Sequence, residues 1–479
     1  ETHEHWKTID AYLNGTFDLW PAGVKGPKAF PAKPSSILEN AASFNMPQVA
    51  HITRPARKKG NKKQEKADDV ELFLTAMLDD VTRKESTLTI PTFRRHVLAY
   101  GYGVLEGPLV DNKAEEIKGK LQSPFRVRAP HPQRVLMAPH ERHPGEAFKS
   151  VRMFARDIDA LVARKGGGDA KVFSGVWLDG HNPFDDFDTK QYWSEDWHLF
   201  FVDDALLYVE ENAWGFLPFL QTFSGWGAEP TELTKLNPKS LAVGILDHSL
   251  DSLKRHAQRT AATHNALMEA GLFQYGYEGK QDATQVAQAL AAGALLQGKK
   301  DEYWFKETPN LPAWMFQAGG EIDADIEEAT YSRDLGGRRQ PGVNTVGQQE
   351  ILSSRSDRKF DAPAMGIDAT VTELCSNVLR LVKVLDVDVT IRGETIGPKD
   401  VNEDYAVEVT YQRDDPVMQI QQRVQGREDV KLGILDPDTA MTDEGRENEQ
   451  EILRKALVDR MASSEQIISA VIELEAAEF

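Results

Sequence analysis

The sequence has little of several features that would define a class of protein. It contains one cysteine, Cys375, among 479 residues, which excludes an internal disulfide framework and a cysteine-based zinc site. It has no run of about 18 uncharged apolar residues, so we expect no membrane-spanning helix. Residues 1–10 show neither the basic start nor the apolar stretch of a signal peptide. We therefore expect an intracellular protein.

Positive charge is also scarce. The chain carries 75 Asp and Glu against 56 Lys and Arg, a formal net charge of −19. This balance argues against tight binding to nucleic-acid phosphates, although it leaves open a surface over which nucleic acid slides. The length and a hydrophobic content of 41% are sufficient for several structural units with their own cores.

Complete catalytic and nucleotide-binding motifs are absent from the sequence. The segment "GYGVLEG" (101–107) is one residue too long for a dinucleotide fingerprint, and no GxxxxGK[ST] motif occurs. Ser224, in "TFSGWG", lacks the frame of a nucleophile elbow. Cys375 lies on the apolar stripe of a predicted helix, which favours a small buried side chain over a reactive thiol.

The histidines and acidic clusters give no stronger signal. No histidine spacing places two metal ligands on one helical face, so we expect exposed or stacking histidines and no metal site at His3, His5, His131, His140 and His143. One acidic stretch could supply paired carboxylates for acid–base chemistry. Nothing near it in the sequence fixes a partner, and a solvated acidic face is the preferred interpretation of Asp323, Asp325, Glu327 and Glu328.

Hydrophobic periodicity in the first half predicts helices around a strand-rich region. Residues 53–66 carry seven basic residues and are typical of a solvated, mobile loop. Residues 67–81 have the apolar spacing of a helix, and residues 93–107 form a helix or strand that enters a glycine turn. Between 124 and 220, short alternating runs separated by Pro and Gly predict strands with one short helix.

The second half predicts long helices. Residues 239–270 form one helix with a narrow apolar stripe, which suits packing beside neighbouring helices, including those of other subunits. Residues 345–385 are helical almost throughout, and two alternating segments near 387–396 and 405–414 read as strands. Acidic helices follow to residue 479. The sequence therefore predicts an α+β fold.

The loop "DLGGRRQPGVNT" (334–345) separates two predicted helices. Glycines on both sides of Arg338 and Arg339 allow the backbone to change conformation. The arginines could contact phosphate, or they could cap a helix or pair with acids of a neighbouring subunit. The sequence leaves these alternatives open.

The order of segments resembles the portal proteins of tailed bacteriophages. The helix "ADDVELFLTAMLDDV" precedes a second helix that ends in the turn "VLAYGYGVLE", and the strand "SPFRVRAPHPQRVLMAP" follows. The segment "ENAWGFLPFLQTF" is similar to the family's G-(F/I)-x-P strand before the long stem helix. Near the C-terminus, "KLGILDPDTAMTDEGRENEQEILRKALVD" is similar to two further family stretches. The resemblance covers most of the chain, and its specificity lies in the order of the motifs.

This resemblance implies a portal fold with a strand-rich wing, stem helices, a small clip, a long tunnel helix and a helical crown. In the numbering of this chain the implied parts are an N-terminal wing (1–238), a first stem helix (239–270), a clip (271–310), a second stem helix (311–334), a tunnel loop (335–345), a tunnel and wing helix (346–385), wing strands (386–425) and a crown (426–479).

The resemblance also implies a function without enzymatic activity or cofactor. The implied assembly is a ring, expected to be a dodecamer, at one vertex of a virion capsid, through which double-stranded DNA passes without sequence specificity. Its implied protein partners are the large terminase subunit, a head–tail adaptor, the major capsid protein and scaffold proteins. The implied DNA-facing loop residues are Gly336, Gly337, Arg338, Arg339, Gln340 and Asn344, and the implied clip contacts are Lys299, Lys300, Tyr303 and Trp304.

Two other functions remain open from the sequence. The chain could be a different interaction scaffold, with segment 53–66 as a docking arm. It could also be a divergent hydrolase that uses carboxylates such as Asp323 or Glu327. A closed ring of many copies would favour the portal over the scaffold.

Overall fold

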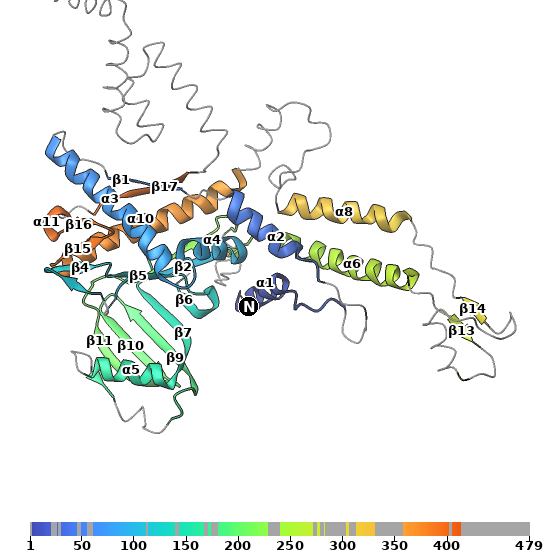
Figure 1. The fold of residues 1–479 in the computed structure, drawn as a ribbon, viewed down its shortest axis with the longest axis horizontal. Coiled ribbons are helices and arrows are strands. Elements are labelled where there is room, and N and C mark those ends of the chain that lie inside the picture. Colours follow the sequence, from blue (N-terminus) through green and yellow to red (C-terminus); the bar gives the residue numbers. More distant parts are fainter. Residues whose placement is uncertain are drawn as a thin grey trace, which may run out of the picture. The chain divides into compact units, whose positions relative to one another are not determined.

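The computed structural model describes 16 stretches of the chain, which together contain the elements labelled in Figure 1. Contacts divide the chain into two units, Glu1–Tyr411 and Gln412–Phe479, and the descriptions below concern the first. The described residues are 2–20, 26, 30–45, 49–54, 61–111, 114–138, 143–166, 171–173, 181–228, 240–271, 275–277, 282, 303–305, 313–330, 358–401 and 405–412, with single-residue stretches at 26 and 282.

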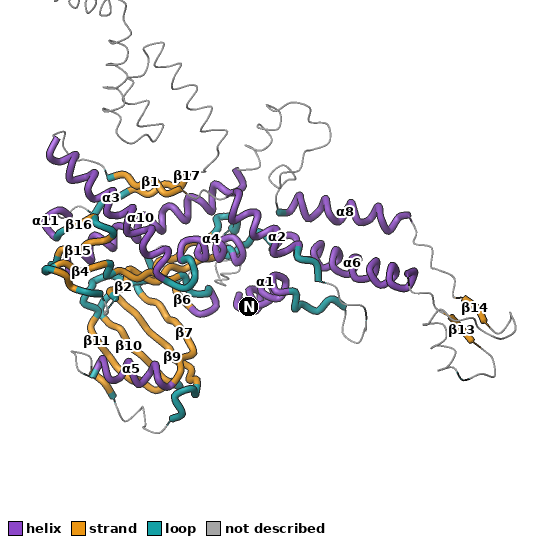
Figure 2. The backbone as a smooth tube through the Cα atoms, viewed as in Figure 1, coloured by secondary structure: helices purple, strands orange, loops and turns teal. Residues whose placement is uncertain are grey.

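The mixture of helices and sheets confirms the predicted α+β class (Figure 2). Among the described residues, no helix is long and apolar enough to cross a membrane. The α-helices are α1 (Thr2–Asn14), α2 (Lys33–Asn40), α3 (Asn61–Lys84), α4 (Thr89–Tyr100), α5 (Ala155–Lys165), α6 (Leu250–Gly271), α8 (Ala313–Ala329), α10 (Asp361–Leu385) and α11 (Pro398–Val401).

The main core is made by α3, α4 and α10 around a three-stranded sheet in the order β12-β2-β5. Helix α4 ends at Gly101, which adopts the left-handed conformation at φ 66° and lets the chain enter β2 directly. The predicted glycine turn is confirmed at Gly101 alone, because residues 102–107, also expected in the turn, belong to β2. The strands of this sheet are β2 (Tyr102–Val110), β5 (Phe125–Arg128) and β12 (Phe219–Phe223).

A six-stranded antiparallel sheet forms the strand-rich region, in the order β6-β7-β9-β10-β11-β8. Helix α5 covers one face of this sheet, as Figure 1 shows. The predicted set of short strands with one short helix is confirmed. The strands are β6 (Val135–Met137), β7 (Glu146–Phe154), β8 (Lys171–Val172), β9 (Asp186–Ser194), β10 (Trp197–Val202) and β11 (Ala205–Glu211).

Smaller sheets complete the described fold. A four-stranded sheet has the order β16-β15-β4-β3, in which β15 and β4 are parallel. Two further pairs are β1 with β17 and β13 with β14. The bounds are β1 (Val49–Thr53), β3 (Glu116–Ile117), β4 (Lys120–Gln122), β13 (Tyr275–Tyr277), β14 (Tyr303–Phe305), β15 (Asp388–Ile391), β16 (Glu394–Ile396) and β17 (Glu408–Gln412).

The predicted start of the helix at residue 239 is wrong, because α6 begins at Leu250. Residues 241–247 instead pack closely against the end of α4. The amide of Ile245 donates to the carbonyl of Leu98 at 2.8 Å, and a side chain at Gly244 would meet the backbone of Ala99. This close approach holds the segment in a turn rather than a helix.

The predicted basic loop at 53–66 is wrong at its end, because α3 already begins at Asn61. Lys66 lies within this helix and pairs with Asp400 at 3.0 Å. Polar residues such as Asn61 and Lys62 extend the helix by more than one turn before its apolar stripe begins, and periodicity of apolar residues does not detect such an extension.

Candidate assembly and channel elements

Helices α6 and α8 lie side by side and form the helix pair that the sequence suggested as a stem (Figure 1). Their connection, residues 272–312, includes the antiparallel strands β13 and β14. On α6, Leu253, Ala257 and Ala261 are buried, and the two alanines pack with Leu19. These residues of the apolar stripe are therefore covered within their own chain, as suits a helix that packs beside neighbouring elements.

Small residues let the helix pair approach closely. The guanidinium of Arg259 on α6 occupies the space where a side chain at Gly319 of α8 would lie. Gln258 reaches away from the pair and donates to the carbonyl of Leu19 at 2.7 Å. The N-terminal segment thus holds α6 through both a polar and an apolar contact.

A cluster of charges joins the helix pair to α2. Lys33 of α2 lies 2.5 Å from Asp323 of α8, and His256 of α6 lies 3.5 Å from the same carboxylate. Burial alone would raise the pKa of Asp323, but the Lys33 ammonium and the nearby His256 and Arg259 outweigh it, so the pKa lies below its ordinary value. Burial lowers the pKa of His256, which favours a neutral ring.

This cluster corrects the expectation of a fully solvated acidic face on α8. The side chain of Asp323 is one-third exposed and paired, whereas Asp325 and Glu328 are exposed as expected. A carboxylate held in this way is a structural anchor between helices. It is not a free acid or base poised toward a cavity.

Strands β13 and β14 contain two of the candidate clip residues. Tyr303 is paired with Tyr277, and Trp304 is paired with Gly276. Lys299 and Lys300 lie outside the described residues. Within the part of the chain that the structure describes, β13 and β14 pair only with each other, and a two-stranded sheet is marginal by itself in water.

The candidate tunnel loop lies outside the described residues, which resume at Arg358. Gly336, Gly337, Arg338, Arg339, Gln340 and Asn344 therefore remain predictions. The helix that follows, α10, has the predicted apolar stripe, and Val371, Leu374, Cys375 and Val378 are all buried. Burial raises the pKa of the Cys375 thiol to about 12, as expected for an inert core residue.

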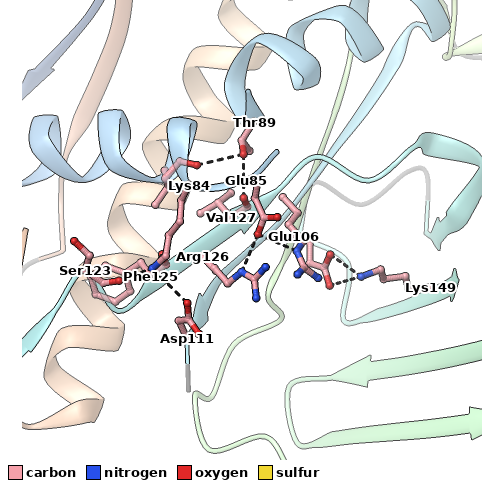
Figure 3. A network of polar contacts seen from close by, with 12 residues as sticks. Lys84, Glu85, Thr89, Glu106, Asp111, Ser123, Phe125, Arg126, Val127 and Lys149 are labelled. Atoms are coloured by element: carbon pink, nitrogen blue, oxygen red, sulfur yellow. Dashed lines mark hydrogen bonds and ion pairs between the residues drawn. The ribbon is translucent and has the colours of Figure 1, made fainter. Parts of the chain in front are cut away.

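A polar network fastens the core to the six-stranded sheet (Figure 3). Lys149 of β7 contacts both carboxylate oxygens of Glu106 on β2, at 2.6 and 2.7 Å, and both side chains are at least nine-tenths buried. Nearby, Glu85 accepts from Arg126 at 2.8 Å and from Arg128 at 3.1 Å. No local sequence pattern predicts these pairs, because their members lie about 40 residues apart.

These pairs are fully engaged with each other, and their arrangement is structural. Among the described residues, no group of three or more potential metal ligands lies close enough to hold an ion. Ser224 donates to the carbonyl of Val243 at 2.7 Å and is fully buried, so it is no exposed nucleophile.

The histidines also serve structural roles where they are described. His131 contacts the hydroxyl of Tyr100 at 2.9 Å and packs edge-on against its ring. That hydroxyl in turn donates to Asp10 of α1. His5 of α1 pairs with Asp247 at 2.7 Å. Exposed or stacking histidines were expected, whereas their polar contacts and their role in fastening α1 were not. His140 lies outside the described residues.

Comparisons with known proteins give limited information. No family model matches the chain, and no curated protein matches it. Among solved structures, the chain is similar to one described as the neck of a native GTA particle, computed with C12 symmetry. The similarity covers 79% of this chain and 89% of that chain, at 11% sequence identity and a TM-score of 0.38. These values are too low to establish a shared fold.

Proposed function

We propose that this chain is a portal protein of a tailed bacteriophage. In this proposal many copies, expected to number twelve, form a ring at one capsid vertex. DNA enters and leaves through the ring, and the packaging motor and the tail connector dock on it. The protein has no cofactor and no enzymatic activity of its own.

The observation that carries the proposal is the order and pairing of the elements after the strand-rich region. A long helix, α6, leads into a connection that contains the strand pair β13–β14, and α8 then returns beside α6. The glycine-rich segment 334–345, which contains two arginines and was predicted as a loop, precedes the long helix α10 in the sequence. This succession supports a stem, a clip, a tunnel loop and a tunnel helix in the order that the sequence resemblance implies.

The electrostatics also suit a channel. A ring that neutralised many phosphates would bind DNA with strong, salt-dependent affinity and hold it in place. A chain with a net charge of −19, whose basic residues gather in local segments such as 53–66 and Arg338–Arg339, repels DNA over most of its surface. We infer that Arg338 and Arg339 make brief contacts with phosphates as DNA passes.

The hydrolase alternative is weakened by the state of its proposed carboxylate. Asp323 is paired with Lys33 across two helices, where it serves packing rather than catalysis. The scaffold alternative differs from a portal in its assembly. Native mass spectrometry and electron microscopy of the purified chain test this directly: a closed ring of about a dozen copies with a central hole supports the portal. A monomer or dimer that stays so with its capsid partners present would contradict it.

A further inference from the structure

The C-terminal end of α8 lacks a positive charge of its own. The carbonyl groups in the last turn of a helix have no partner within the helix, and they carry a partial negative charge. The last turn of α8 contains Glu327 and Glu328 and no basic residue. These acids add to the negative charge instead of compensating it. A cation from another part of the chain is therefore favoured at this end of the helix.

Lys359, directly before α10, supplies that cation. Its ammonium donates to the carbonyl of Ala329 at 2.7 Å and to the carbonyl of Thr330 at 2.6 Å, across 30 and 29 positions of the chain. The side chain of Thr330 in turn donates to the carbonyl of Ile326 at 2.6 Å. Burial lowers the pKa of Lys359, as expected for an ammonium drawn partly out of water. The last turn of α8 is thus closed by a residue that belongs to the start of α10.

The backbone of Lys359 is itself fastened to the main core. The indole of Trp226 donates to the carbonyl of Lys359 at 2.7 Å, and its ring packs edge-on against the buried Phe360. The amide of Trp226 donates to the hydroxyl of Ser224 at 3.2 Å. That hydroxyl donates to the carbonyl of Val243 at 2.7 Å, in the turn before α6. A continuous series of hydrogen bonds therefore runs from the start of α6 to the end of α8.

This series lies at one end of the α6–α8 pair. Because α8 returns beside α6, the start of α6 and the end of α8 lie at the same end of the pair (Figure 1). Lys359 connects that end to the start of α10. The sequence between Thr330 and Lys359 contains Arg338 and Arg339, so the two residues that flank this segment are joined to each other.

We propose that Lys359 is a positioning residue that couples the end of α8 to the start of α10, so that the two helices move together. The coupling is carried by a contiguous set of hydrogen bonds and is a property of the single chain. Its role in a channel rests on the proposed function. In a portal, a displacement of the segment that contacts DNA reaches both helices at once.

The first test is hydrogen exchange in the full chain with the variant Lys359→Met, which keeps an unbranched side chain and removes the ammonium. We expect exchange to become faster by at least about tenfold in the last turn of α8 and in the first two turns of α10, because two hydrogen bonds from a charged donor are lost. Lys359→Arg should restore protection in both places, since a guanidinium also donates to two carbonyls.

The matched control is Arg358→Met, which removes a positive charge from the adjacent exposed position. Its exchange should equal that of the wild type. Unchanged exchange in Lys359→Met would overturn the inference, as would an equal increase in the control. Faster exchange in α8 with full protection of α10 would also overturn it, because Lys359 would then only cap the helix.

The second test measures DNA retention in assembled particles. Lys359→Met should change retention while the ring stays intact, and Lys359→Arg should return it to the wild-type level. Retention equal to that of the wild type in the methionine variant would overturn the positioning role. A wild-type chain that forms no ring would contradict the portal proposal alone, because the exchange measurement still decides whether Lys359 couples the two helices.

Discussion

The main core, made by α3, α4 and α10 around the three-stranded sheet and called the body below, is held together by different means from the α6–α8 helix pair. In the body, large side chains such as Phe93, Phe125 and Leu374 are fully buried around the three-stranded sheet. In the helix pair, Gly319 leaves space for Arg259, and the alanines of α6 pack with the N-terminal segment. One shared carboxylate, Asp323, joins the pair to α2. Because apolar burial dominates stability, the body should be the more stable region and the pair the more easily rearranged one.

The largest expected effect comes from breaking the buried ion pair of the body. Lys149→Met leaves Glu106 buried without a partner, which should cost about 3–5 kcal/mol in the free energy of unfolding. Urea denaturation followed by circular dichroism measures this loss. The double variant Glu106→Leu/Lys149→Met removes both charges and should recover most of it. If the double variant does not recover the lost free energy of unfolding, the pair has a role beyond compensating its own charges.

A smaller effect is expected from overpacking the helix pair. Ala257→Leu adds three carbons to a contact built for a methyl group, which should cost about 1–3 kcal/mol. Hydrogen exchange should become faster in α6 and α8 while α4 and α10 keep their protection. Ala262→Leu, at a half-buried position on the same helix, is the control. Faster exchange throughout the chain would show that the two regions unfold together.

The two regions also contain carboxylates whose pKa values are displaced in opposite directions. Burial raises the pKa of Asp368 in α10 to about 6 from its ordinary 3.8, despite the amide of Tyr411 and the nearby Arg94. Its folded form binds a proton more tightly than the unfolded chain does, so this group makes stability fall as pH rises from about 4 to about 6. The lowered pKa of Asp323 gives the opposite sign, and its contribution is lost as pH falls below about 4.

Asp368→Asn should therefore remove the part of the pH dependence that lies between about pH 4 and pH 6. Asp323→Asn should remove only the part that lies below about pH 4, and its effect at neutral pH should be at most about 1 kcal/mol because the pair is partly exposed. Urea midpoints measured at half-unit steps of pH distinguish the two variants. If the two variants show the same dependence of stability on pH, the raised pKa of Asp368 and the lowered pKa of Asp323 are contradicted.

The smallest effect on stability, and a specific effect on function, is expected from Arg338→Ala/Arg339→Ala. These residues belong to neither apolar region, so ring assembly and melting temperature should be unchanged. DNA packaging or retention should change, because the brief phosphate contacts are lost. Arg83→Ala, on the exposed surface of α3, removes a similar charge elsewhere and is the control. Loss of the ring in the arginine variant would instead make the loop a contact between subunits.

Local patterns in the sequence predicted much of the fold. The apolar periodicity of α3 and α10 and the alternation in the six-stranded sheet are strong enough to define those elements, and Gly101 marks the end of α4. The start of α6 could not be predicted, because residues 241–247 are held in a turn by the backbone of α4 rather than by their own pattern.

The candidate site was less accessible to sequence reasoning. The pairing of Asp323 with Lys33 joins residues 290 positions apart, and no local pattern encodes such a contact. Tyr303 and Trp304 were named from the portal resemblance; their segment forms β14, and their role as clip contacts stays a prediction. The alternating segment "WHLFFVDDALLYVEE" (197–211) suggests that apolar residues line both faces of the six-stranded sheet. Only the strand register shows that one line of them runs across five strands: Leu136, Phe148, Tyr192, Leu199 and Val209.

The most direct test of the central claim is an electron-microscopic reconstruction of the assembled particle at a resolution that distinguishes helices. The account predicts a closed ring in which the α6–α8 pairs surround an axial channel wide enough for duplex DNA, with residues 336–344 facing that channel. A ring whose α6–α8 pairs lie on the outer rim, or an assembly without an axial channel, would contradict it.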